Sequence, residues 1–114
     1  MLSIEALKEF GANTQEGLNR CLNQEEFYLR LVKNAVEGDG FDKLSTALEQ
    51  NDLDRAFEAS HALKGVLANL ALTPLFEVCN EMTELLRART QIDYVPYNEK
   101  LQKLREKLKA LCEE

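Results

Sequence analysis

The stretch from Asp52 to Leu72 constrains the fold most strongly, because its apolar residues recur at helical spacing. Advancing each residue by about 100° around a helix axis gathers six residues on one side: Ala56, Ala59, Leu63, Val66, Leu67 and Leu70. A stripe of this kind is buried against other helices in a globular protein. The stretch therefore predicts one helix, from near Asp52 to near Ala71, that packs in a bundle.

The same periodicity runs through three other long segments and two short ones. Residues 24–50 read as one bundle helix with a break at 38–40, and Asn23 followed by Glu26 resembles a capping box at its start. Thr73 and Pro74 predict the next helix, with threonine as its cap, and the last helix follows Asp93. Short helices are expected over 3–10 and 14–22.

These segments predict an all-α protein, an up-and-down four-helix bundle over residues 24–112 with short N-terminal capping helices over 1–22. With 114 residues, we expect a single domain over 1–114. The chain has only two prolines and no tryptophan, and helix-forming residues dominate its composition.

Charge and composition exclude several classes of function. The net charge is −6 and the basic residues are dispersed, so no nucleic-acid surface is expected. No apolar run is long enough for a bilayer and the start lacks the pattern of a signal peptide, which predicts a cytoplasmic protein without membrane contact. The three cysteines are scattered and are expected to be reduced core residues, and no metal site is expected.

His61 is the only histidine, and it lies roughly 160° from the centre of the apolar stripe. We therefore expect its imidazole to face solvent. Lys64 lies beside it on the same face, where an ammonium would stabilise an anion that the imidazole acquires. Gly65 follows one turn later although a glycine costs a helix about 1 kcal/mol relative to alanine, so a side chain there would obstruct something. A neutral imidazole nitrogen is a nucleophile near neutral pH, and these features together predict a phosphoryl-accepting histidine.

The rest of this outer face is unusual because it carries apolar side chains. Phe57, Ala68 and Leu72 are therefore predicted to contact a partner protein. The alternative is that the capping segment 3–22 covers part of the face, an objection that applies most to Phe57. Glu58 lies at the side, where its carboxylate either reaches the imidazole through a water or is an ordinary surface group, and we count it with the partner-binding residues.

The run Ser60-His61-Ala62-Leu63-Lys64-Gly65, continued by residues 66–71, resembles the phosphorylation helix of histidine-containing phosphotransfer (HPt) domains. These domains are the relay modules of multistep two-component signalling. The resemblance covers roughly positions 13–90 and, loosely, the final helix. The chain departs from the family pattern at Ala71, where glycine is common, and at Thr83, where members often carry glutamate.

The resemblance implies a phosphorelay intermediate rather than an enzyme. His61 would accept a phosphoryl group through Nε2 from the receiver domain of a hybrid histidine kinase and pass it to an aspartate of a response regulator. Lys64 would stabilise the phosphoryl group, and Gly65 would leave clearance for the partner. No cofactor is expected in this chain, because the receiver would supply the Mg²⁺. We expect a monomer, since the active face must dock successive partners.

The alternative from another class is a non-phosphorylated helical adaptor that binds receiver or kinase domains through the same face. An adaptor would not need His61, Lys64 and Gly65 together. The phosphoryl-accepting domain of a kinase would require a nucleotide-binding domain, for which 114 residues leave no space. An independent enzyme is least favoured, because the sequence has no phosphate-binding glycine-rich loop and no evident nucleophile paired with a base.

Overall fold

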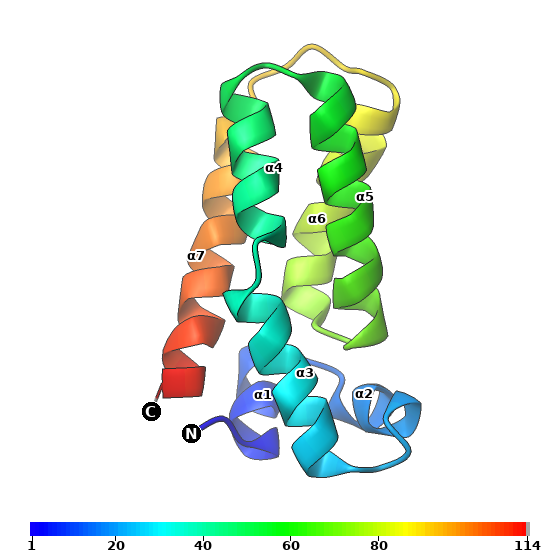
Figure 1. Ribbon diagram of the computed structural model, residues 1–114, viewed down its shortest axis with the longest axis vertical. Helices are drawn as coiled ribbons and strands as arrows, with labels where there is room; N and C mark the ends of the chain where they lie inside the picture. Colours follow the sequence, from blue (N-terminus) through cyan, green and yellow to red (C-terminus); the bar gives the residue numbers. More distant parts are fainter. Residues whose placement is uncertain (114) are drawn as a thin grey trace.

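The computed structural model describes residues 1–113, and the regular secondary structure of these residues is entirely helical (Figure 1). The helices are α1 (Ile4–Phe10), α2 (Thr14–Arg20), α3 (Glu25–Glu37), α4 (Gly40–Glu49), α5 (Leu53–Asn69), α6 (Thr73–Arg87) and α7 (Val95–Glu113). The all-α prediction is therefore confirmed.

Helix α5 occupies the centre of the packing. It lies against both α4 and α6, and α7 packs against α6 and α3. Figure 1 shows that the chain reverses direction at each connection from α4 to α7, while α1 and α2 gather at one end of these helices beside α3. The long axis of the molecule measures 41 Å and the shorter axes 25 and 20 Å.

The apolar stripe of α5 forms much of the core. Ala56, Leu63 and Leu67 are buried on the side that the periodicity predicted. Val66 was placed on the same stripe, but 42% of its surface is exposed. The buried stripe of the helix is therefore narrower than the wheel predicts. The opposite side of α5 is left open.

The predicted break in segment 24–50 is present, and it separates two helices. α3 ends at Glu37, the chain is extended at Gly38, and α4 begins at Gly40. Because the break interrupts the helical hydrogen bonds, carbonyls at the end of α3 need other donors. Those donors come from α7.

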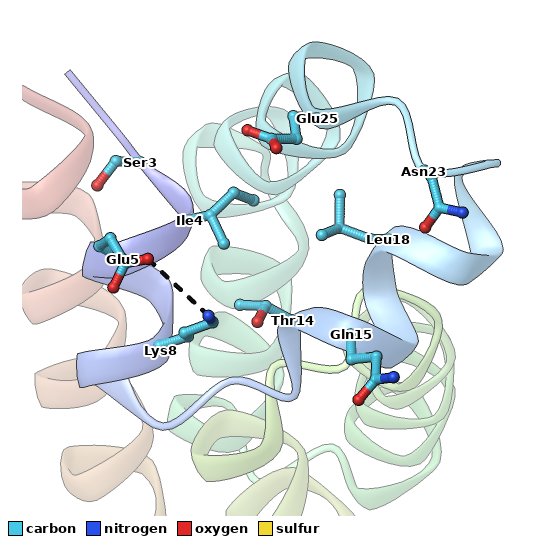
Figure 2. Close-up of a pocket in the computed structure, with 9 residues that line it drawn as sticks. All are labelled: Ser3, Ile4, Glu5, Lys8, Thr14, Gln15, Leu18, Asn23 and Glu25. Carbon is cyan, nitrogen blue, oxygen red and sulfur yellow. Dashed lines mark ion pairs between the residues drawn. The ribbon is translucent and has the colours of Figure 1, made fainter.

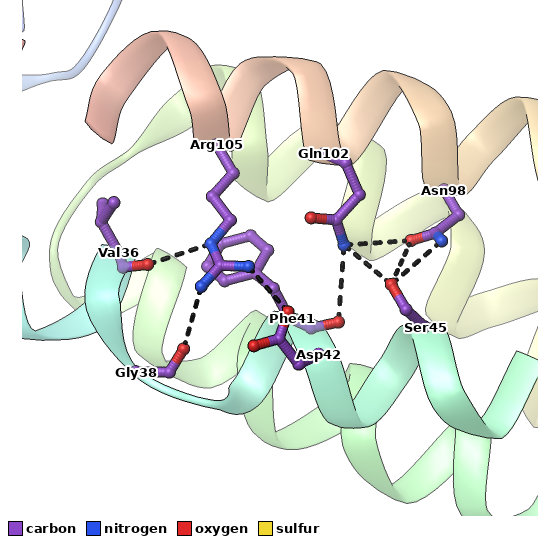
Figure 3. Close-up of polar contacts among 8 residues, drawn as sticks. All are labelled: Val36, Gly38, Phe41, Asp42, Ser45, Asn98, Gln102 and Arg105. Carbon is purple, nitrogen blue, oxygen red and sulfur yellow. Dashed lines mark hydrogen bonds and ion pairs between the residues drawn. The ribbon is translucent and has the colours of Figure 1, made fainter. Parts of the chain in front are cut away.

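Arg105 of α7 closes this break (Figure 3). Its guanidinium donates to the carbonyls of Val36 at 3.0 Å and Gly38 at 3.2 Å, and it pairs with the Asp42 carboxylate at 3.0 Å. Its Cζ also lies 4.8 Å from the centroid of the Phe41 ring. Only 7% of Arg105 is exposed. One side chain therefore joins the end of α3, the start of α4 and the middle of α7.

The N-terminal cap is fastened to the end of α5. The hydroxyl of Tyr28 donates to the Leu70 carbonyl at 2.8 Å, and the backbone N–H of Asn13 donates to the Ala71 carbonyl at 2.9 Å. Gly17 packs so closely on Tyr28 that a Cβ there would overlap the phenol ring. These bonds satisfy carbonyls that the end of a helix leaves without a partner.

Two predicted helix caps are wrong. Asn23 has a left-handed backbone with φ of 59° and lies outside α3, whose N-cap is Gln24 without a side-chain hydrogen bond. Thr73 is the first residue of α6 rather than its cap, a position that Leu72 takes. Pro74 does lie in the first turn of α6, as predicted.

The substitution Tyr28→Phe should lower the free energy of unfolding by about 1–2 kcal/mol at neutral pH, because the Leu70 carbonyl loses a buried donor. Burial, followed by interaction with Cys21, raises the pKa of Tyr28 from 10.0 to about 12. The folded state thus holds the phenolic proton more tightly, so this stabilisation is complete below pH 10 and falls as the pH rises through 12. Denaturant unfolding across this window should show a steeper loss for the wild type than for the variant.

Tyr97→Phe is the matched control, since its hydroxyl makes an exposed bond to Glu81 and its loss should change the stability at neutral pH little. Parallel pH curves for the wild type and Tyr28→Phe would contradict the role assigned to the buried hydroxyl.

The substitution Arg105→Met should lower the free energy of unfolding by about 2–3 kcal/mol, because two backbone carbonyls lose a charged donor. Arg105→Lys should recover only part of this loss, since a single ammonium cannot reach three acceptors with the same geometry. Lys103→Met, on the exposed side of the same helix, should change stability by no more than about 0.5 kcal/mol. Guanidinium chloride unfolding of the four proteins measures these differences, and equal midpoints would show that the break does not depend on Arg105.

Candidate functional site

His61 lies near the middle of α5 and its side chain is exposed, as the helical wheel predicts. Its neighbour Ser60 is fully buried, and the Ser60 hydroxyl donates to the Phe57 carbonyl at 3.1 Å. Ser60 therefore packs inside the bundle. The histidine stands on the open side of a helix whose other side is fixed in the core.

Phe57 lies one turn before His61 and contacts it directly. The centroids of the two rings are 5.6 Å apart and their planes differ by 20°, a stacked arrangement. The Cζ atoms of Arg87 and Arg89 lie 5.0 and 4.9 Å from the centroid of the Phe57 ring. Cation–π contacts at exposed sites are worth about 0.5–1 kcal/mol each. The phenylalanine is half-buried and packs against the hydrophobic core, and the two arginines come from the end of α6 and the turn after it rather than from the capping segment.

Both arginines are themselves held in place. Arg87 pairs with Glu84 at 3.2 Å, and Arg89 pairs with Asp54 of α5 at 2.7 Å. The guanidinium of Arg89 also donates to the Leu86 carbonyl at 2.8 Å. Sequence reasoning missed both arginines, because they follow the apolar stripe of α6 and meet α5 only once the two helices are aligned.

Lys64 is half-buried on the face that His61 occupies. Behind this face, the buried thiol of Cys79 on α6 donates a hydrogen bond to the Ser60 carbonyl at 3.4 Å. Burial raises the pKa of Cys79 to about 11, and hydrogen bonding with Thr83 and the charge of Lys64 oppose this rise.

Gly65 is exposed, and a Cβ built on it would meet no atom within 4 Å. No close approach inside the described part of the chain therefore requires a glycine at this position. Gly17 is the opposite case, because Tyr28 fills the space beside it. Gly65 therefore lowers the stability of the helix, and no packing contact inside the described residues compensates for this loss.

Glu58 and Ala68 lie on opposite ends of the same helix face. Glu58 is exposed, and none of the hydrogen bonds or ion pairs found among residues 1–113 involves its carboxylate. Ala68 is half-buried, and its carbonyl accepts a hydrogen bond from Arg20 of α2 at 2.5 Å. The capping segment thus reaches the outer face near Ala68, as the alternative interpretation allowed, whereas the arginines that contact Phe57 belong to the end of α6 and the turn after it.

The prediction that Leu72 contacts a partner is wrong, because its side chain is 0% exposed. α5 ends at Asn69, and Ala71 takes a left-handed backbone with φ of 54°. Leu72 then donates its backbone N–H to the Leu67 carbonyl at 3.0 Å and turns inward as the N-cap of α6. Leu72 lies beyond the last residue of α5, so the helical wheel does not describe the direction of its side chain. The departure from glycine at Ala71 falls at the one left-handed residue of this turn, where an alanine costs about 1–2 kcal/mol.

A groove that sequence reasoning did not predict runs between α4 and α5. Two adjoining hollows share Asp39, Lys43, Ala59 and Ala62 in their lining. Glu58 lines one of them, so the groove borders the face that carries His61. A separate hollow lies between α1, α2 and the start of α3, where Lys8 and Glu5 pair at 3.9 Å (Figure 2).

Within residues 1–113, no group of three His, Cys, Asp or Glu side chains is arranged to hold a metal ion. None of the helices in this range is long and apolar enough to cross a membrane.

Comparison with known proteins identifies the family. A family model described as the Hpt domain matches residues 38–114, which is more than half of the chain, so the chain belongs to the Hpt domain family. Membership implies histidine phosphotransfer in two-component signalling. Neither the curated proteins nor the solved structures gave a match. The match begins at the break before α4, so α4 to α7 carry the family pattern and α1 to α3 precede it.

The substitution Gly65→Ala should raise the free energy of unfolding by up to about 1 kcal/mol, because the helix gains a better helix former and the new methyl group meets open space. Gly17→Ala is the matched control and should lower stability, since its methyl group would overlap Tyr28. Denaturant unfolding of both variants checks the pair. A loss of stability in Gly65→Ala would show that this glycine serves the fold itself.

Proposed function

We propose that the protein is a phosphorelay intermediate in which His61 accepts and donates the phosphoryl group. The observation that carries this proposal is the exposure of the only histidine at mid-helix, inside the region that the Hpt family model matches. Its donor would be the aspartyl phosphate of a receiver domain in a hybrid histidine kinase. Its acceptor would be the aspartate of a response regulator.

The proposed step is a direct transfer between two side chains. The lone pair of His61 Nε2 forms a bond to phosphorus, and the bond from phosphorus to the aspartate oxygen breaks with its electrons remaining on the carboxylate. Nδ1 keeps its proton. Such transfers depend on alignment and on neutralising the charge of the phosphoryl oxygens. Lys64 would supply one positive charge, and the receiver would bring the Mg²⁺.

The partner would dock on the open face of α5. Because Gly65 has no side chain, the backbone of the partner could approach His61 closely there. Phe57, Glu58 and Ala68 would line the contact. The groove between α4 and α5 extends this surface on the side of Glu58. In this proposal the chain forms one domain over residues 1–114, in which capping helices over 1–22 precede an up-and-down four-helix bundle over 24–112. The protein would act as a monomer in the cytoplasm.

The phosphoryl acceptor is tested with a receiver domain labelled on its aspartate. The wild-type chain should gain an acid-labile, base-stable label, and His61→Gln should gain none, because an amide nitrogen is not a nucleophile. Gly65→Ala, which keeps the histidine, should be labelled about tenfold more slowly if its methyl group meets the partner. Wild type that binds receivers but takes no label would favour the adaptor and contradict the relay.

A further inference from the structure

The arginine pair on Phe57 is a feature that phosphoryl acceptance alone does not explain. Arg87 ends α6 and Arg89 lies in the turn beyond it, so the ring is held from outside its own helix. Arg89 is tied to Asp54 at 2.7 Å, one turn before Phe57 on α5. Together with the packing of Phe57 against the core, these contacts restrict the half-buried aromatic ring.

The imidazole of His61 has few other contacts. Among the hydrogen bonds and ion pairs found for residues 1–113, none involves a ring nitrogen of His61. The stacking on Phe57, with ring centroids 5.6 Å apart and planes at 20°, is therefore the contact that defines the plane of the imidazole. Nε2 is therefore free to attack phosphorus, as a phosphoryl acceptor requires.

We propose that Phe57 is a positioning residue for the transfer: its ring, held by Arg87 and Arg89, fixes the plane of the His61 imidazole so that Nε2 points at the incoming phosphorus. The inference rests on the proposed function and deepens it. The lone pair of Nε2 lies in the plane of the ring, so in-line attack requires that plane to be oriented. Phe57 thus orients the imidazole before any partner docks, and it would also contact the docked partner.

The size of the effect follows from the rotamers that stacking excludes. A histidine on a helix has two populated χ1 wells, because the third clashes with the preceding turn, and roughly two orientations about χ2, so about one conformer in four presents Nε2 in a given direction. Loss of the stack should therefore slow transfer by about two- to fourfold. A larger loss would require a second role for the phenylalanine.

The test uses phosphoramidate, a small donor that has no docking surface. Transfer forms the bond from Nε2 to phosphorus and breaks the P–N bond of the donor, and ammonia leaves with the electron pair. Phe57→Leu should be phosphorylated about two- to fourfold more slowly than the wild type. Phe57→Tyr, which keeps the aromatic ring, should restore the wild-type rate.

Phe27→Leu is the matched control. Phe27 is an exposed phenylalanine on α3 with Arg30 over its ring at 5.7 Å, so it makes the same kind of contact on a different helix. Its replacement should leave the rate unchanged. Circular dichroism of each variant verifies that the compared proteins are folded.

A second measurement follows the ring itself. Three-bond couplings across the χ1 angle of His61, measured by NMR, should indicate one rotamer in the wild type and averaged rotamers in Phe57→Leu. The double substitution Arg87→Gln and Arg89→Gln should produce partial averaging with Phe57 intact. These couplings do not depend on the charge of the donor, so they separate orientation from electrostatic attraction.

Each outcome decides a different point. Phe57→Leu that reacts with phosphoramidate at the wild-type rate but accepts poorly from a receiver would make Phe57 a docking residue and overturn the inference. An averaged His61 rotamer in the wild type would overturn it as well. Phosphoramidate labelling of His61 without any transfer from receivers would contradict the proposed relay. In that case the rates of the Phe57 variants with phosphoramidate would still test the positioning role.

Discussion

The burial of one stripe of α5 between α4 and α6 determines where the rest of the site lies. Leu63 and Leu67 fix the rotation of the helix about its axis, and that rotation places His61 on the open side. Because α5 is rigid between Leu63 and Leu67, the same buried residues also determine the directions of Lys64 and Gly65. Apolar packing on the buried side of α5 therefore determines which of its residues face outward.

The helical elements and the exposure of His61 could be predicted because they depend on local spacing. The errors have local causes too. Leu72 was assigned to the outer face because the periodicity does not mark where α5 ends, and the left-handed turn at Ala71 is not visible in an alanine. Asn23 carries a capping residue's side chain but a backbone that cannot cap α3.

The contacts that sequence reasoning missed join residues far apart in the chain. Arg105 bonds to Val36 and Gly38, and Arg89 pairs with Asp54, across separations that no local pattern records. A charged residue in a helical segment is most often a solvated one, so nothing distinguished Arg105 from the lysines beside it. Its role is determined by the register of α7 against α3 and α4, which only the folded chain defines.

The single open face of α5 has a kinetic consequence for a relay. One histidine on one face admits one docked protein at a time, so a donor and an acceptor would compete for the same surface. The loaded chain would have to release the first partner before it meets the second, and the residence time of the donor would then limit the throughput of the pathway. Tight binding to either partner would slow the signal, which favours modest affinity for both.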